Sequence, residues 1–142
     1  MIKPKRSVEP HSATTPPEFF LDRCLEKRVA AELRSRGRSV HLVADAFPQD
    51  GQETSDEEWI AYGISQGWSL LTQDDRIRYR AGELAALAEG SCVLFCLSSA
   101  KLSVVEKTTR FHNMRGNIDR AITRGGPAFY KVYEDRIEKK WP

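Results

Sequence analysis

Short apolar runs alternate with helix-like stripes along most of the chain, and this alternation is the feature that most restricts its fold. The runs occupy residues 19–21, 39–45, 68–72, 91–97 and 128–134. Between them, apolar residues recur at the three- and four-residue spacing of a helix face. Strands that alternate with helices form a mostly parallel sheet with right-handed crossovers. The sequence therefore predicts an α/β fold in three layers, α/β/α, with a mostly parallel sheet of about five strands.

The predicted helices have recognisable starts and ends. Two helices begin with the S-x-x-E spacing of a capping box, at Ser55 with Glu58 and at Ser103 with Glu106. The second box opens one long helix, which we expect to run to the Gly-Gly-Pro sequence at residues 125–127.

Aspartates stand at the ends of three successive apolar runs. Asp22 follows the first run, Asp45 ends the second, Asp74 follows the third, and Asp56 lies in the first turn of the helix after Ser55. Because ligands collect at the carboxyl ends of parallel strands, we expect these four carboxylates to converge as catalytic residues. Converging carboxylates need a cation, and oxygen ligands suit Mg²⁺ or Mn²⁺. Such an ion activates water for attack on a phosphodiester, so the pattern indicates nucleic-acid hydrolysis.

Each of these aspartates, taken alone, has a structural interpretation as a helix cap or a loop residue. Asp75 is expected to be a cap or a residue that supports the acids from behind. The segment RIRYR follows directly, and its arginines Arg76, Arg78 and Arg80 either bind substrate phosphates or form a solvated loop. Both interpretations of RIRYR stay open.

Composition limits the class of protein. A chain of 142 residues with 40% hydrophobic content forms one domain with a core. The net charge of +2 does not by itself indicate nucleic-acid binding. Residues 1–17 are rich in Pro, Ser, Thr and charge, so we expect a flexible arm before a domain at 18–142. No apolar stretch suits a membrane span or a secretory signal, which predicts a cytoplasmic protein without membrane contact.

The segments FFLDR, SDEEWIAYG and WSLLTQDDRIR together resemble the PIN domain, and particularly the PIN-like VapC-type toxins. The resemblance extends from about Glu18 to Glu134. In that family one Asp follows the first strand, another opens a helix, and a third lies in a T-x-D segment. Asp22, Asp56 and Asp74 match these positions, so the resemblance makes them metal ligands. The family's fourth acid, a helical Glu, has no clear counterpart here; Asp45 is our substitute, with Glu53 as the other candidate.

The resemblance implies an Mg²⁺- or Mn²⁺-dependent endoribonuclease that leaves a 5′-phosphate. It also implies the toxin component of a type II toxin–antitoxin pair, with RNA and a cognate antitoxin as partners and a strand order of 3-2-1-4-5. The RNA target, the number of metals and the oligomeric state, including a homodimer, stay open.

Two other functions compete with this one. The first is a PIN-like module that binds RNA or a partner without cleaving, because the fourth acid is uncertain. The second is a phospho-receiver domain, which has paired acids after its first strand and a Lys after its last. Here Arg23 follows Asp22, and Glu134 and Asp135 follow the last strand, so the second function is disfavoured.

Overall fold

The computed structural model describes residues 16–142, and the predicted arm at 1–17 lies outside them apart from Pro16 and Pro17. The elements are β1 (Glu18–Leu21), α1 (Lys27–Ser35), β2 (Ser39–Leu42), α2 (Val43–Ala46), η1 (Pro48–Gly51), α3 (Asp56–Gln66), β3 (Ser69–Thr72), η2 (Asp75–Tyr79), α4 (Ala81–Ala88), β4 (Val93–Leu97), α5 (Val104–Asn113), α6 (Arg115–Arg124), β5 (Ala128–Val132) and β6 (Ile137–Trp141), where η marks a 3-10 helix. Within residues 16–142, no helix is both long and apolar enough to cross a membrane.

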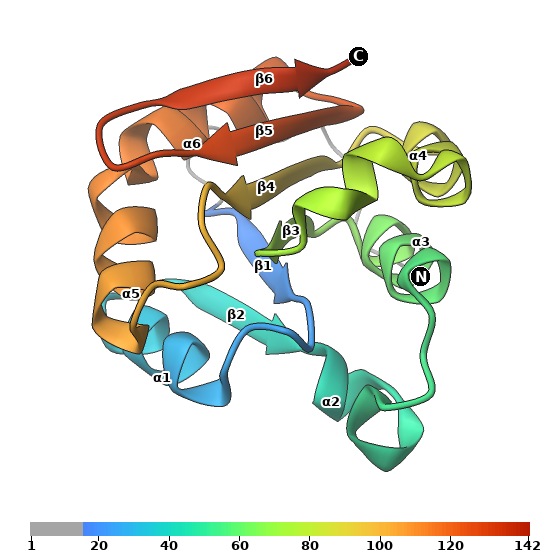
Figure 1. The fold of residues 1–142 in the computed structure, drawn as a ribbon, viewed down its shortest axis with the longest axis horizontal. Coiled ribbons are helices and arrows are strands. Elements are labelled where there is room, and N and C mark those ends of the chain that lie inside the picture. The colour runs from blue at the N-terminus through green and yellow to red at the C-terminus, as the bar shows by residue number, and fades with distance from the viewer. Residues whose placement is uncertain (1–15) are drawn as a thin grey trace.

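One six-stranded sheet forms the middle layer, in the order β2-β1-β3-β4-β5-β6. Strands β1 to β5 are parallel, and β6 runs antiparallel to β5. Figure 1 shows α1, α5 and α6 on one face of the sheet and α3 and α4 on the other. The predicted three-layer α/β fold with a mostly parallel sheet is therefore confirmed.

The predicted strand order of 3-2-1-4-5 is wrong, because β3 lies between β1 and β4. The physical reason is burial. All four residues of β3 are buried, whereas β2 has an exposed first residue and a half-buried His41. A strand that is apolar on both faces needs neighbours and helices around it, so β3 is central and β2 takes the edge.

Two hydrophobic clusters cover the faces of the sheet. The first joins β-strand residues such as Leu21 and Phe95 to α1, α5 and α6, and the second joins Phe20 and Leu70 to Trp59 of α3 and Leu87 of α4. Neighbouring residues of one strand, such as Phe20 and Leu21, belong to opposite clusters because side chains alternate along a strand. Both capping boxes are present as predicted, at Ser55 and at Ser103.

Three local predictions are corrected by the structure. The second strand ends at Leu42, so Asp45 lies on the short helix α2 rather than at a strand end. The long helix is interrupted at Met114, which leaves helical geometry with ψ near 10° and separates α5 from α6. Strand β6 was not predicted, because three charged residues separate the two apolar residues of its sequence, IEKKW. Its charged side chains suit an edge strand.

Gly63 provides a test of the packing between α3 and the sheet. A Cβ atom at Gly63 would meet Leu70 Cδ2 and lie 3.2 Å from Phe20 Cδ2. Both neighbours are fully buried, so they have little room to move. We expect Gly63→Ala to lower the free energy of unfolding by about 1–3 kcal/mol, measured by urea denaturation.

Gly116 in α6 is the matched control for this substitution. A Cβ there would lie 3.5 Å from Arg120 Nη1, an ordinary contact. Gly116→Ala should therefore leave the stability unchanged or raise it by up to about 1 kcal/mol through helix propensity. Equal effects of the two substitutions would contradict the close approach of α3 to β3.

Candidate active site

Thr72 links the two aspartates that follow neighbouring central strands. The Asp22 amide donates to the carbonyl of Leu71 at 2.9 Å, which continues the pairing of β1 with β3. Thr72 Oγ1 donates to Asp22 Oδ2 at 2.7 Å and accepts from the Asp74 amide at 3.0 Å. The ends of β1 and β3 are thus joined through one hydroxyl, and Asp22 and Asp74 lie at the same edge of the sheet.

Asp22 is the most buried acid of this edge, with only 7% of its surface exposed. Burial raises the pKa of Asp22 above its ordinary value of 3.8, the hydrogen bonds from Thr72 and Cys24 oppose this, and the nearby charge of Asp56 adds to it. Cys24 is an exposed residue, but its sulfur faces inward at 3.3 Å from Asp22 Oδ2. Burial of this thiol raises the pKa of Cys24 to about 12, so it stays protonated and donates to the carboxylate.

Arg80 holds three further acids around one guanidinium. Its Nη1 lies 3.1 Å from Asp56 Oδ2, 3.1 Å from Glu83 Oε2 and 3.8 Å from Asp74 Oδ2. The other oxygen of Asp56 accepts from the indole of Trp59 at 2.8 Å, which fixes the carboxylate at the start of α3. Asp56, Asp74 and Glu83 therefore converge on one positive charge supplied by the chain itself.

Asp74 also has a structural role. It is the N-cap of η2, where its side chain accepts from the Arg76 amide at 3.1 Å, and it pairs with the Arg76 guanidinium at 2.9 Å. Burial alone would raise the pKa of Asp74, but the hydrogen bonds from Arg76 and the charges of Arg76 and Arg80 outweigh it and lower the pKa below 3.8. Asp22 and Asp74 thus differ in the direction of their pKa shifts.

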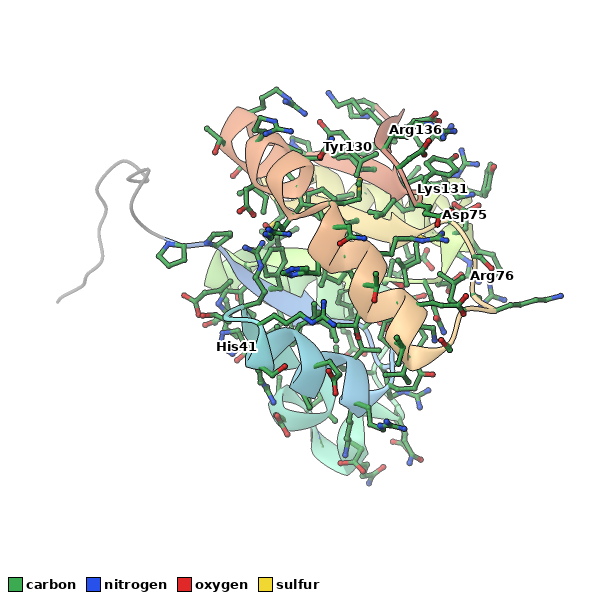
Figure 2. All side chains as sticks on the ribbon, turned by 90° about the vertical axis from the view of Figure 1, so that its left-hand side faces the viewer. His41, Asp75, Arg76, Tyr130, Lys131 and Arg136 are labelled. Carbon is green, nitrogen blue, oxygen red and sulfur yellow. The ribbon has the colours of Figure 1, made fainter. Side chains whose placement is uncertain are left out.

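Asp75, the neighbouring acid, takes part in a separate group. Its carboxylate binds Arg78 at 3.0 Å and Lys131 of β5 at 3.3 Å. Figure 2 shows Asp75 beside Lys131, with Arg76 at the same side of the molecule and His41 at the opposite side. Of the three arginines of RIRYR, Arg76 is the most accessible, because 75% of its side chain is exposed although it pairs with Asp74.

Asp45 and Glu53, the two sequence-based candidates for a fourth acid, are exposed, and within residues 16–142 neither forms a salt bridge. The structure instead brings Glu83 to the group, with 10% of its side chain exposed. Glu83 and Leu87, four residues apart, are the buried residues of α4 and lie on the same face of this helix. A carboxylate on an apolar face needs a partner, and here that partner is Arg80.

The donor set of the group consists of hard carboxylate oxygens, which suits Mg²⁺ or Mn²⁺. Within residues 16–142, no three His, Cys, Asp or Glu side chains already form a cation-binding geometry. The position between Asp56, Asp74 and Glu83 is taken by the Arg80 guanidinium. These acids fit a divalent cation if Arg80 moves away from them.

The sequence matches one known protein family. A family model described as "PIN like domain" matches residues 17–99, which is more than half of the 142-residue chain. The match covers β1 to β4 and includes Asp22, Asp56, Asp74 and Glu83. No curated protein and no solved structure matches the chain.

The opposite pKa shifts of Asp22 and Asp74 predict opposite effects of neutral substitutions. Asp22→Asn keeps an acceptor for Thr72 and removes a buried charge, so we expect stability at pH 7 without metal to rise by up to ~1 kcal/mol. Asp74→Asn removes the pairing with Arg76 and Arg80 and should lower stability by about 1–2 kcal/mol. Urea denaturation in EDTA measures both values.

The pH dependence of stability is the control for these two variants. Because the folded pKa of Asp74 is lowered, its stabilisation is present above pH 3.8 and is lost as the pH falls through the folded pKa. The folded pKa of Asp22 is raised, so its ionisation costs stability only above pH 3.8 and the gain from Asp22→Asn should vanish below that pH. Two variants with the same pH profile would contradict this electrostatic difference.

Proposed function

The chain belongs to the PIN-like domain family, and from this membership and the site geometry we propose that it is a metal-dependent endoribonuclease. The observation that carries the proposal is the convergence of Asp56, Asp74 and Glu83 on the Arg80 guanidinium, beside Asp22 and Thr72. A group of acids that needs a cation, at the carboxyl ends of parallel strands, is where an α/β domain binds its ligand. PIN-like membership makes nucleic-acid cleavage the chemistry to test there.

Asp22, Asp56 and Asp74 would hold Mg²⁺ or Mn²⁺, with Glu83 in place of Asp45 as the fourth acid. When bound, the ion would supply an activated water and neutralise charge on the phosphodiester. Thr72 and Trp59 position Asp22 and Asp56 through hydrogen bonds of 2.7 and 2.8 Å. Ligands held in this way lose little side-chain freedom on binding, which favours a precise site.

RNA is the proposed substrate, and Arg76 is the residue of RIRYR best placed to contact its phosphates. It is exposed beside Asp74, whereas Arg78 pairs with Asp75 and Arg80 faces the acids. The toxin role in a type II pair, silenced by an antitoxin protein, rests on the likeness of FFLDR, SDEEWIAYG and WSLLTQDDRIR to VapC-type toxins. Growth arrest on expression, relieved by the product of an adjacent small gene, tests that role.

One observation favours the alternative of a non-catalytic PIN-like module. Arg80 supplies a positive charge to three acids and Arg76 supplies a second one to Asp74, so the negative charge of the group is partly compensated without a metal. A module of this kind would bind RNA and leave it intact at every Mg²⁺ and Mn²⁺ concentration.

Cleavage of a structured RNA by the purified chain, with and without Mn²⁺, tests the nuclease directly. We expect Asp56→Asn and Asp74→Asn each to lower the cleavage rate at least ~100-fold, because both remove a carboxylate from the cation position. Asp135→Asn, in an exposed turn next to Arg136, is the matched control and should keep the full rate. Glu83→Gln and Asp45→Asn separate the two candidates for the fourth acid, and a loss only in Asp45→Asn would overturn the choice of Glu83.

Arg80→Gln tests whether the arginine and a metal compete for the same acids. Removing the guanidinium leaves Asp56, Asp74 and Glu83 without their shared cation, so we expect Mn²⁺ to bind about tenfold more tightly, or about 1.4 kcal/mol. Calorimetric titration of the folded variant measures this without any need for activity. Arg78→Gln, which loses the pairing with Asp75 and the contact with the Tyr79 ring but none with Asp56, Asp74 or Glu83, should bind Mn²⁺ as the original chain does. Weaker binding by Arg80→Gln would show that Arg80 supports the metal site instead.

A further inference from the structure

A cavity of about 210 Å³ opens next to Asp22, between the ends of β1 and β2 and the start of α1. Its apolar lining comes from Leu21, Leu25, Leu42 and Val43, which are all buried side chains. Asp22 belongs to the same lining. The cavity therefore has a floor of apolar side chains that are at most 9% exposed, and it borders one of the acids of the candidate active site.

One side of the cavity is cationic. Arg23 and Lys27, in the loop before α1 and at its first residue, line this side and are exposed. Within residues 16–142, neither side chain forms a salt bridge. Two unpaired cations beside an apolar surface suit a ligand that joins an anionic group to a flat apolar one.

The other side of the cavity is formed by a strained loop. Gln49 and Asp50 both have φ of 57°, a left-handed conformation that costs a residue other than glycine about 1 kcal/mol or more. Gly51, with φ of 75°, continues this conformation, and a Cβ there would lie 2.7 Å from Val43 Cγ1. The backbone at Gly51 therefore passes close to Val43, and the neighbouring residues Asp50 and Gln52 belong to the lining of the cavity.

We propose that this cavity binds one nucleoside of the RNA substrate, with the base against the apolar lining and an adjacent phosphate on Arg23 and Lys27. This inference rests on the proposed ribonuclease function and names the part of the substrate that the site recognises. Single-stranded RNA presents unstacked bases with apolar faces and polar edges, and proteins bind them in such pockets. With Asp22 in the wall, the phosphate next to the bound nucleoside lies beside the acids.

Asp50 makes the cavity selective among bases. A carboxylate only accepts hydrogen bonds, and it pairs with exocyclic amino groups such as N4 of cytosine. Uracil carries no amino group, and its single N–H donor lies between two carbonyl oxygens that a carboxylate repels. We therefore expect uridine to bind most weakly of the four nucleosides.

The test is a titration of the full chain in EDTA, followed by ¹H–¹⁵N NMR. The ligands are the four nucleoside 5′-monophosphates and, as a control without a base, ribose 5-phosphate. We expect the nucleotides other than UMP to shift the amides of Ala44 and Gln52 and to bind at least tenfold more tightly than ribose 5-phosphate. Equal affinity for ribose 5-phosphate, or shifts confined to other regions, would overturn the base-binding cavity.

Two cavity variants, each with a matched control, also test whether the cavity binds a nucleotide. Ala44 lines the cavity and is half-buried, so Ala44→Phe should fill it and weaken CMP binding at least tenfold. Ala31→Phe, at an exposed position of α1, should bind CMP unchanged. If Ala44→Phe fails to fold, Gln52→Ala against the exposed Gln66→Ala makes the comparison, with weaker binding expected only for Gln52→Ala. Unchanged CMP affinity in the folded cavity variant would overturn the proposal.

Because these titrations need no metal and no cleavage, they separate the two proposals. Nucleotide binding in the cavity together with intact RNA in the cleavage assay would reject the nuclease and keep the base site. Cleavage by the original chain and by Ala44→Phe at the same rate and affinity would reject the base site and keep the nuclease.

Discussion

The side-by-side burial of β1 and β3 is the constraint on which the candidate active site depends. Phe20 pairs with Leu70 and Leu21 with Leu71, so the residues that follow are fixed at the same level of the sheet. A slip of one residue would turn every apolar side chain of either strand to the wrong face, and both faces are covered by helices. The Thr72 hydrogen bond to Asp22 therefore follows from the core packing and needs no special loop.

Asp22 and Asp74 have different electrostatic surroundings, because the arginines at this edge of the sheet lie close to only one of them. Arg76 and Arg80 both approach Asp74, whereas the contacts of Asp22 are neutral groups, Thr72 and Cys24. The pKa of Asp22 is raised by its burial, and the arginines lower the pKa of Asp74. The Thr72 hydroxyl contacts the carboxylate of Asp22 and the backbone amide of Asp74, and the carboxyl groups of these two residues have opposite pKa shifts, a pattern that is common where acids perform different tasks.

The sequence predicted the fold more completely than the site, for a physical reason. Hydrophobic periodicity and capping boxes are local, so the alternation of elements and the caps at Ser55 and Ser103 were predictable. The strand order depended on comparing burial between strands, and the full burial of SLLT against SVHLVAD would have placed β3 in the centre. Glu83 and Arg80 are three residues apart and pair locally, but the approach of Arg80 to Asp56 was harder to predict, since it depends on how η2 turns the chain back towards α3. Asp22 and Asp74 were correctly expected at one edge, while their roles as ligands stay predictions.

The contact of Arg80 with three acids lets the domain fold without a bound cation. Arg80 contacts Asp56, Asp74 and Glu83 in the folded protein and reduces the repulsion between them without an ion. A cation that binds there must separate Arg80 from its partners. The free-energy cost of this separation depends on whether the guanidinium can reach water. Arg80 has 37% of its side chain exposed, so it can move into water and remain solvated. By contrast, separating Lys131 from Asp75 would leave a buried charge unpaired, because only 16% of the Lys131 side chain is exposed. The exposure of Arg80 would therefore allow the proposed exchange of the arginine for a cation without a change of fold.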